Sequence, residues 1–123
     1  MQFLNAWIPA GPPGTPALAA LGTLRSSSAR PLMIEDLTST DFRAVELHRT
    51  VSKNGVARMM KLDNVTITPG ESLELKRGGR HIMLVGPKRS LSAGDVVTLK
   101  VRASGGSYLF RIAIREQSPR AAP

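Results

Sequence analysis

The stretch AVELHRTVSKNGVARMMKLD, residues 44–63, contains the strongest fold signal in this chain. Asn54-Gly55 in its middle is the dipeptide preferred by two-residue type I′ turns, which connect antiparallel strands. β-Branched and other apolar residues lie on both sides of the turn, as expected for paired strands. The segment therefore predicts a β-hairpin with the cross-strand pairs Lys53–Val56, Thr50–Met59, His48–Lys61 and Leu47–Leu62.

This register gives the two faces of the hairpin different roles, because successive side chains of a strand point to opposite sides. Leu47 and Leu62 share one face, which is expected to lie against the core. His48 and Met59 share the other face as diagonal neighbours, which usually lie about 7–8 Å apart. Met60 is therefore expected to point into the core as a flexible filler, whereas its neighbour Met59 is a candidate ligand.

A second hairpin is predicted from Ser72 to Gly86, with Gly78-Gly79 as its turn. Its expected cross-strand pairs, which are apolar and should be buried, are Leu75–Ile82 and Leu73–Leu84. His81 and Met83 are two residues apart, so they project together from the opposite face. Each of the two hairpins thus presents one histidine and one methionine away from the core.

The rest of the chain also consists of short apolar runs between turn signals, a pattern typical of antiparallel sandwiches and barrels. The predicted elements are strands at Phe3–Ile8, Ala17–Leu24 and Leu32–Leu37, a proline-rich loop at 9–16, a turn at Ser39–Phe42, and a third hairpin from Val96 to Ile114 that turns within Ser104–Ser107. We therefore predict an all-β fold in one domain, residues 1–123, with residues 116–123 as a loose tail.

The composition limits the chemistry but leaves the role of the charge open. The 123 residues include no cysteine, which excludes disulfides, thiolate zinc sites, thiol catalysis and blue-copper centres. The formal charge of +8 is spread along the chain. It favours either an acidic partner or anionic membrane surface, or simply a soluble surface, and the lack of interleaved aromatics argues against nucleic acid. No apolar run in the sequence has the roughly 20 residues that a transmembrane helix needs.

The two histidines and two of the methionines form a candidate metal site: His48, Met59, His81 and Met83. If the fold brings the two hairpin faces together, these residues supply two imidazoles and two thioethers. Imidazole suits several metals, but thioether sulfur suits few, chiefly the soft ion Cu(I). Zinc would normally require thiolate or carboxylate ligands. The competing interpretation is structural, since a lone histidine on a strand is usually a polar surface residue and a lone methionine usually belongs to the core.

The spacing of these residues resembles the signature of the PCuAC family of periplasmic copper chaperones. Ten residues separate His48 from Met59, twenty-one separate Met59 from His81, and one separates His81 from Met83. Other stretches that look like the family's sequence are Ala6-Trp7, Pro12–Gly14, Val45–His48, Pro69-Gly70, Gly78-Gly79, His81–Leu84 and Gly94-Asp95. The resemblance covers about residues 5–115.

The resemblance implies a cupredoxin-like, Greek-key β-sandwich that binds one Cu(I) through these four residues. It also implies a periplasmic metallochaperone, not an enzyme, that delivers copper to the CuA centre in subunit II of cytochrome c oxidase. Sco-type thioredoxin-fold proteins are the expected co-workers, and the chaperone itself is expected to be a monomer. Met1–Ile8 lacks the features of a signal peptide, so either the protein stays where it is made or an export signal has been removed. The resemblance to periplasmic proteins implies the second.

Two departures from the family pattern lead to further expectations. Small residues around Leu21-Gly22 replace the family's usual aromatic, so this strand is expected to pack loosely. The tail Ser118–Pro123 contains no histidine or methionine, so the second copper site that some members carry there is not expected.

Two other functions remain as alternatives to delivery. The same site could serve a periplasmic copper buffer or resistance protein. Alternatively, the chain could be a basic β-sandwich module that binds an anionic partner, with an accidental His/Met set. A hydrolase or oxidase is disfavoured, because neither histidine belongs to a convincing triad and four protein ligands leave no obvious position for a substrate.

Overall fold

The computed structural model describes residues 1–119, so residues 120–123 of the predicted tail lie outside the described part. The described residues form ten strands and no helix: β1 (Gln2–Pro9), β2 (Ala17–Arg25), β3 (Leu32–Thr38), β4 (Phe42–Lys53), β5 (Val56–Lys61), β6 (Thr66–Ile67), β7 (Ser72–Leu75), β8 (Arg80–Pro87), β9 (Val96–Ala103) and β10 (Gly106–Arg115). Accordingly, this part of the chain contains no helix able to cross a bilayer.

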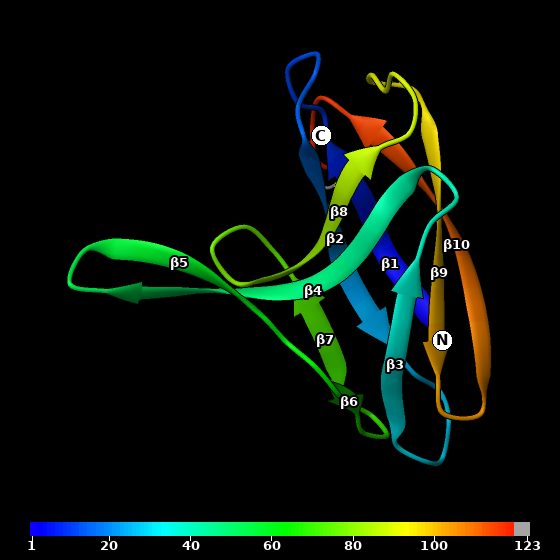
Figure 1. The fold of residues 1–123 in the computed structure, drawn as a ribbon. Coiled ribbons are helices and arrows are strands. Elements are labelled where there is room, and N and C mark those ends of the chain that lie inside the picture. The colour runs from blue at the N-terminus through cyan, green and yellow to red at the C-terminus, as the bar shows by residue number, and fades with distance from the viewer. Residues whose placement is uncertain (120–123) are drawn as a thin grey trace.

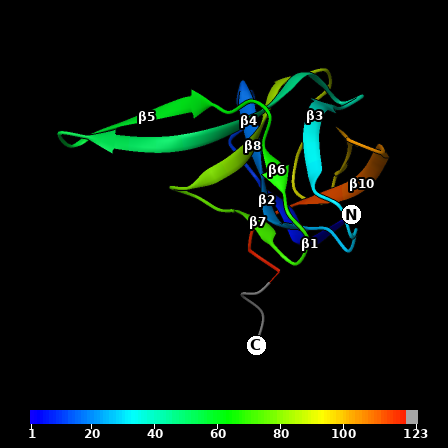
Figure 2. The same cartoon turned by 90° about the horizontal axis from the view of Figure 1, so that it is seen from below.

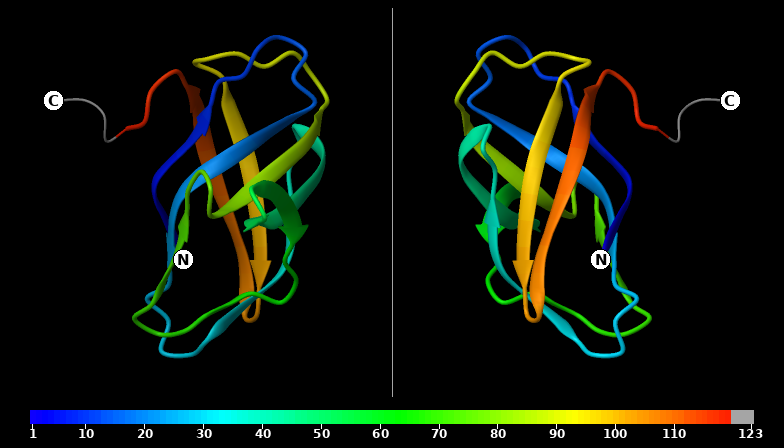
Figure 3. Two further views of the ribbon diagram at one scale, coloured as in Figure 1. Left: turned by 90° about the vertical axis from the view of Figure 1, so that its left-hand side faces the viewer. Right: turned by 90° about the vertical axis from the view of Figure 1, so that its right-hand side faces the viewer.

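The strands form one continuous sheet that curls over a central core (Figures 1 and 3). Its order is β5-β4-β8-β2-β1-β10-β9-β3-β6, and β7 pairs separately with β2. β1 and β10 pair in parallel, which joins the half that contains β2, β8 and β4 to the half that contains β9 and β3. The predicted all-β sandwich is therefore confirmed.

The core between the two halves is built from alternate residues of nearly every strand, mostly Leu, Ile and Val. The side chains that are most completely buried are Phe42, Ile8, Leu24, Ile82, Leu84, Leu99, Ile112, Ile114, Val97 and Val101. Because side chains alternate along each strand, the neighbours of these residues lie on the outer faces of the sheet. The candidate ligands His48, His81 and Met83 lie on the outer face of β4 and β8.

The first and third predicted hairpins are confirmed. β4 and β5 pair in the expected register, with Thr50 opposite Met59 and His48 opposite Lys61. Asn54 and Gly55 both have the positive φ angles, 53° and 77°, that a type I′ turn requires. β9 likewise pairs along its whole length with residues 106–113 of β10.

The second predicted hairpin is wrong in its pairing. β7 and β8 both pair with β2: Gly22–Arg25 binds β7, and Ala17–Ala20 binds β8. Apolar alternation alone could not reveal this arrangement, because Leu75 and Ile82 are buried in the same core whichever strand they pair with.

The prediction that Met60 fills the core is also wrong, since its side chain is 52% exposed. Met60 does point away from the Met59 face, as the register requires. However, all six residues of β5 are exposed, because the outer part of the β4–β5 hairpin extends beyond the sandwich (Figures 1 and 2). The face that would be buried elsewhere therefore has no sheet opposite it.

The expectation of loose packing around Leu21-Gly22 is wrong as well. Gly22 has φ of 141°, and a Cβ atom there would lie 2.8 Å from the Leu4 carbonyl oxygen and 2.8 Å from the Phe3 ring. Leu21 itself is buried. The absence of a side chain at Gly22 is what allows β1 and β2 to approach so closely.

Candidate metal centre

The four candidate ligands lie on the outer face of the sheet formed by β2, β8, β4 and β5. His48 on β4 is directly opposite His81 on β8, and their ring centroids are 6.1 Å apart. Met83 follows two residues after His81 on the same face of β8. Met59 lies on β5, opposite Thr50, the residue two positions after His48. The structure therefore brings the two predicted His–Met pairs to one place, through direct pairing of β4 with β8.

A pocket on this face contains three of the four candidates. Its lining residues are Ala17, Leu18, Ala19, Leu21, Thr50, Met59, Arg77, Gly78, His81 and Met83. Ala19 lies opposite Met83 on the neighbouring strand, and the small side chains of Ala17 and Ala19 leave the space that larger residues would fill. Met59 is 60% exposed, whereas His81 is only 4% exposed. The pocket thus has a buried imidazole at its base and a solvent-exposed thioether at its edge.

Glu46 fixes the orientation of His48. The Nε2 atom of His48 lies 3.3 Å from the Oε1 atom of Glu46, and Lys61 Nζ lies 3.3 Å from the other carboxylate oxygen. These hydrogen bonds from His48 and Lys61 lower the pKa of Glu46 below its ordinary value, so the carboxylate is ionised at neutral pH. An ionised carboxylate can only accept, so the proton of the neutral imidazole resides on Nε2. Nδ1 of His48 then carries the free lone pair.

His81 is fixed in the opposite way. Its Nδ1 atom lies 3.3 Å from the backbone carbonyl oxygen of Gly79, which requires the proton on Nδ1. The same carbonyl accepts a hydrogen bond from the backbone N–H of Thr50 at 3.0 Å. The loop before β8 therefore connects His81 to β4, and Nε2 of His81 carries the free lone pair.

The two nitrogens left over, His48 Nδ1 and His81 Nε2, are buried and have no hydrogen-bond partner among the described residues. Buried polar atoms are almost always paired, so two unpaired nitrogens on facing rings require an explanation. Metal-bound histidines commonly use one nitrogen as ligand and donate the other N–H to a carboxylate or carbonyl. Both rings show this arrangement, so the residues fit a metal ion.

The surrounding donors favour a soft ion. The described residues contain no cluster of three or more histidine, cysteine, aspartate or glutamate side chains that could hold a metal. The pocket that contains His81 also contains the thioethers of Met59 and Met83. Thioether with imidazole is a donor set suited to Cu(I) and poorly suited to zinc, calcium or magnesium.

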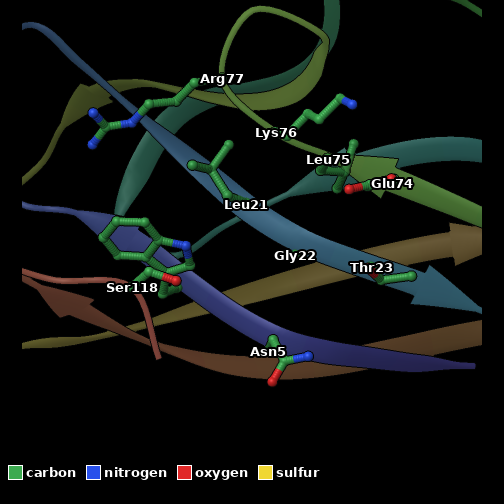
Figure 4. Close-up of a pocket in the computed structure, with 10 residues that line it drawn as sticks. Asn5, Leu21, Gly22, Thr23, Glu74, Leu75, Lys76, Arg77 and Ser118 are labelled. Carbon is green, nitrogen blue, oxygen red and sulfur yellow. The ribbon is translucent and has the colours of Figure 1, made fainter. Parts of the chain in front are cut away.

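Arg77 separates this pocket from a second one, shown in Figure 4. Leu21 and Arg77 line both pockets, and the second pocket also contains Trp7, Glu74 and Lys76. The Arg77 guanidinium carbon lies 5.8 Å from the centroid of the Trp7 ring, within the range of a cation–π interaction. A fixed positive charge therefore lies beside the candidate metal pocket.

Comparison with known proteins identifies the family of this chain. Residues 1–109 match a protein family that is described as putative lipoprotein LpqE-like. The chain belongs to the LpqE-like family. Among its relatives, a putative lipoprotein of Leifsonia xyli subsp. xyli is 34% identical over 108 residues, and an uncharacterised protein of Rickettsia prowazekii is 34% identical over 74 residues. These matches cover 87% and 59% of the LpqE-like chain but only 64% and 41% of the two relatives.

Solved structures similar to this LpqE-like chain are PCuAC domains. The copper-bound PCuAC domain from PmoF2 has a TM-score of 0.75 and 19% identity, with coverage of 94% of this chain and 92% of that domain. The solution structure of Cu(I)-bound DR1885 from Deinococcus radiodurans has a TM-score of 0.73 and 27% identity, with coverage of 95% and 80%. The fold is therefore cupredoxin-like, as the resemblance implied, and the Cu(I)-bound DR1885 structure shares it at 27% sequence identity.

The sequence pattern indicates the four candidate ligands but not the groups that orient the two histidines. Glu46 lies two residues before His48 on β4, so both side chains point to the same face of the strand. The Glu-x-His pattern could therefore have indicated a carboxylate beside the ring. The Gly79 carbonyl gives no such signal, because it depends on the path of the loop between β7 and β8. Ala17 and Ala19 of β2, to which the sequence pattern assigns no role in the site, form part of the pocket wall.

Proposed function

We propose that this chain is a copper chaperone that binds one Cu(I) through His48 Nδ1, His81 Nε2 and the sulfur atoms of Met59 and Met83. The observation that carries the proposal is the pair of buried, unpaired nitrogens on facing imidazole rings. Glu46 and the Gly79 carbonyl hold the two rings in the tautomers that leave these lone pairs free. Thioethers beside them favour Cu(I) over harder ions.

The uneven exposure of the ligands suits the site for transfer. His81 is buried and positioned by the loop before β8, so it would keep copper in place. Met59 is exposed and lies on a hairpin outside the sandwich, so it is the ligand that an incoming donor group could replace first. Thioethers carry no charge or proton, so this replacement requires no proton transfer at the methionine. Ligand exchange would then move Cu(I) to a partner in steps.

The proposed destination is the CuA centre of cytochrome c oxidase subunit II, with a Sco-type protein as co-worker. This part of the proposal rests on the resemblance of the His48–Met83 spacing to the PCuAC signature. An extracytoplasmic location is supported by the lipoprotein description of the family and of the Leifsonia relative. We place the domain in the periplasm or an equivalent compartment outside the cytoplasmic membrane.

The proposal is tested by Cu(I) competition against a chromophoric chelator, with each ligand changed to alanine in turn. Wild type is expected to take up one equivalent of Cu(I), and each of the four single variants should bind it at least tenfold more weakly. His81→Ala should have the largest effect, because His81 is the most buried ligand. Met60→Ala is the matched control, since Met60 adjoins Met59 but points to the other face.

A wild-type chain that takes up no Cu(I), or a Met60→Ala variant as defective as Met59→Ala, would contradict the site as described. Delivery is tested separately by mixing the Cu(I)-loaded chain with a purified CuA domain. Transfer supports the chaperone role. Tight Cu(I) binding without transfer would instead identify a copper buffer that uses the same site.

A further inference from the structure

The outer part of the β4–β5 hairpin carries an unusual surface on the side opposite to the copper site. Between Arg49 and Lys61 the sequence has four cationic residues and no acidic one. Lys61 pairs with Glu46 on the copper side. The other side, which we call the basic face, consists of Arg49, Val51, Lys53, Val56, Arg58 and Met60.

Cationic and apolar residues alternate on the basic face. Each of its three cross-strand pairs joins one cation to one apolar side chain: Arg49–Met60, Val51–Arg58 and Lys53–Val56. Val56 and Met60 are 56% and 52% exposed, which is high for residues of this size and polarity. A shallow hollow on this face is lined by Val51, Lys53, Asn54, Val56, Arg58 and Met60.

The cations of this face lack counter-charges. None of Arg49, Lys53 and Arg58 forms a salt bridge with another described residue. In addition, Arg49 lies directly opposite Arg80 on β8, a like-charge pair that destabilises a sheet unless an anion lies nearby. No described residue forms an ion pair with Arg49, Lys53 or Arg58, so an external anion would complete the surface.

We propose that the basic face docks on an anionic lipid bilayer. A bilayer interface offers phosphates and hydrocarbon within a few ångströms of each other, and cationic side chains can lie along the boundary with their charges toward the headgroups. The cations of the basic face can contact the phosphates, and its valines and methionine can contact the hydrocarbon. Lipid headgroups also move laterally, so they need no fixed pattern complementary to the hairpin.

The position of the copper site favours a bilayer over a protein acceptor as the occupant. His48, Met59, His81 and Met83 open on the opposite side of the same hairpin. An acceptor protein bound to the basic face would have its own ligands on the wrong side of the strands. A bilayer on the basic face leaves the copper site turned toward solvent, where an acceptor can reach it.

The test is the binding of the full chain to vesicles, measured by co-sedimentation at low and high salt. Vesicles of phosphatidylcholine alone are compared with vesicles that also contain phosphatidylglycerol. Wild type should bind only the anionic vesicles, and Lys53→Gln or Arg58→Gln should weaken binding about fivefold each, as expected for one cation near a charged surface. Val56→Ser and Met60→Ser should weaken binding severalfold, including at high salt where electrostatic attraction is screened.

Matched controls lie on β9 and β10, far from the hairpin in the strand order. Arg102→Gln removes an exposed cation, and Leu109→Ser removes a leucine that is 68% exposed. Neither should change vesicle binding by more than a small factor. All variants should retain Cu(I) binding, which shows that they are folded and that the two faces act independently.

Several results would overturn the proposal. Equal binding to both kinds of vesicle would do so, as would an Arg102→Gln defect as large as that of Arg58→Gln, which would attribute binding to overall charge. The absence of vesicle binding together with slower copper transfer by Arg58→Gln would identify the basic face as a docking surface for an acidic protein. Vesicle-bound chain whose copper is inaccessible to a water-soluble chelator would contradict the proposed orientation.

Discussion

At the scale of single residues, the two histidines are chemically equivalent in the sequence but not in the structure. His48 has its Nε2 atom engaged by a carboxylate, whereas His81 has its Nδ1 atom engaged by a carbonyl. The free nitrogens are therefore of different kinds, and the two rings can face one position from neighbouring strands. The spacing of the two histidines and two methionines predicts which residues lie close together. Which ring nitrogen of each histidine is free to bind a metal depends instead on contacts with Glu46 and Gly79.

Glu46 is expected to affect copper binding without contacting the metal. Glu46→Ala removes the acceptor that fixes the His48 tautomer, so Cu(I) affinity should fall about tenfold to hundredfold, the usual effect of losing such a partner. Glu46→Gln should recover part of this loss, because its amide oxygen can still accept from Nε2. Chelator competition measures both variants.

The control for Glu46 is Glu71→Ala, which removes an exposed carboxylate from the turn before β7. It has the same change of charge and should leave Cu(I) affinity unchanged. If Glu46→Ala bound Cu(I) as tightly as wild type, the carboxylate would have no role in orienting His48. If Glu71→Ala were equally defective, the effect would come from net charge alone.

At the scale of strands, the sequence predicts a hairpin well only where its turn specifies the register. Asn54-Gly55 determines both the conformation and the pairing of β4 and β5. Gly78-Gly79 has equally strong turn character, yet β7 and β8 pair with β2 instead of with each other. The order of strands in a sheet depends on contacts between residues far apart in the sequence. A strand with one apolar face can bury that face beside any neighbour that supplies backbone hydrogen bonds.

Gly22 is the point on β2 where these pairings meet, so it provides a test of the packing. Gly22→Ala would place a Cβ atom 2.8 Å from the Leu4 carbonyl oxygen, in addition to the strain of a residue with φ of 141°. We expect it to destabilise the fold by about 2–3 kcal/mol, since both strain and a backbone clash contribute. Thermal unfolding should show a melting temperature roughly 8–12 °C lower.

Gly14→Ala is the matched control for the clash. Gly14 also has a positive φ, 80°, but a Cβ atom there would meet nothing within 4 Å. Its cost should be about 1 kcal/mol, which is the strain alone. If the two variants melted at the same temperature, the close approach of β1 and β2 at Gly22 would contribute nothing to stability.

At the scale of the whole molecule, the protein combines a rigid sandwich with a hairpin that the sandwich barely supports. Among the strands of residues 1–119, β4 is the only partner of β5, and all residues of β5 are exposed. This arrangement explains why the prediction that Met60 is buried failed, although the register on which it rested was right. A binary pattern of apolar and polar residues tells which side of a strand a residue occupies, but not whether another layer covers that side.

The division of the ligands between these two parts leads to a prediction about dynamics. Met59 belongs to the hairpin, whereas His81 and Met83 belong to β8 of the sandwich. If one Cu(I) binds all three, any opening that moves β5 away from β8 must first break the site. At saturating Cu(I), such openings should become rarer by the factor that Met59 contributes to the affinity, at least about tenfold or about 1.4 kcal/mol, because the open form still holds copper through His48, His81 and Met83. Hydrogen exchange of the β5 amides should therefore slow sharply when Cu(I) is added.

Met59→Ala separates this effect from general stabilisation by the metal. The variant still has His48, His81 and Met83, so copper bound to it can stabilise the sandwich without holding β5. The amides of Val56–Lys61 should then exchange as fast with Cu(I) as without it. Equal slowing of β5 exchange in wild type and Met59→Ala would mean that other contacts hold the hairpin, because the substitution removes the proposed link between β5 and copper.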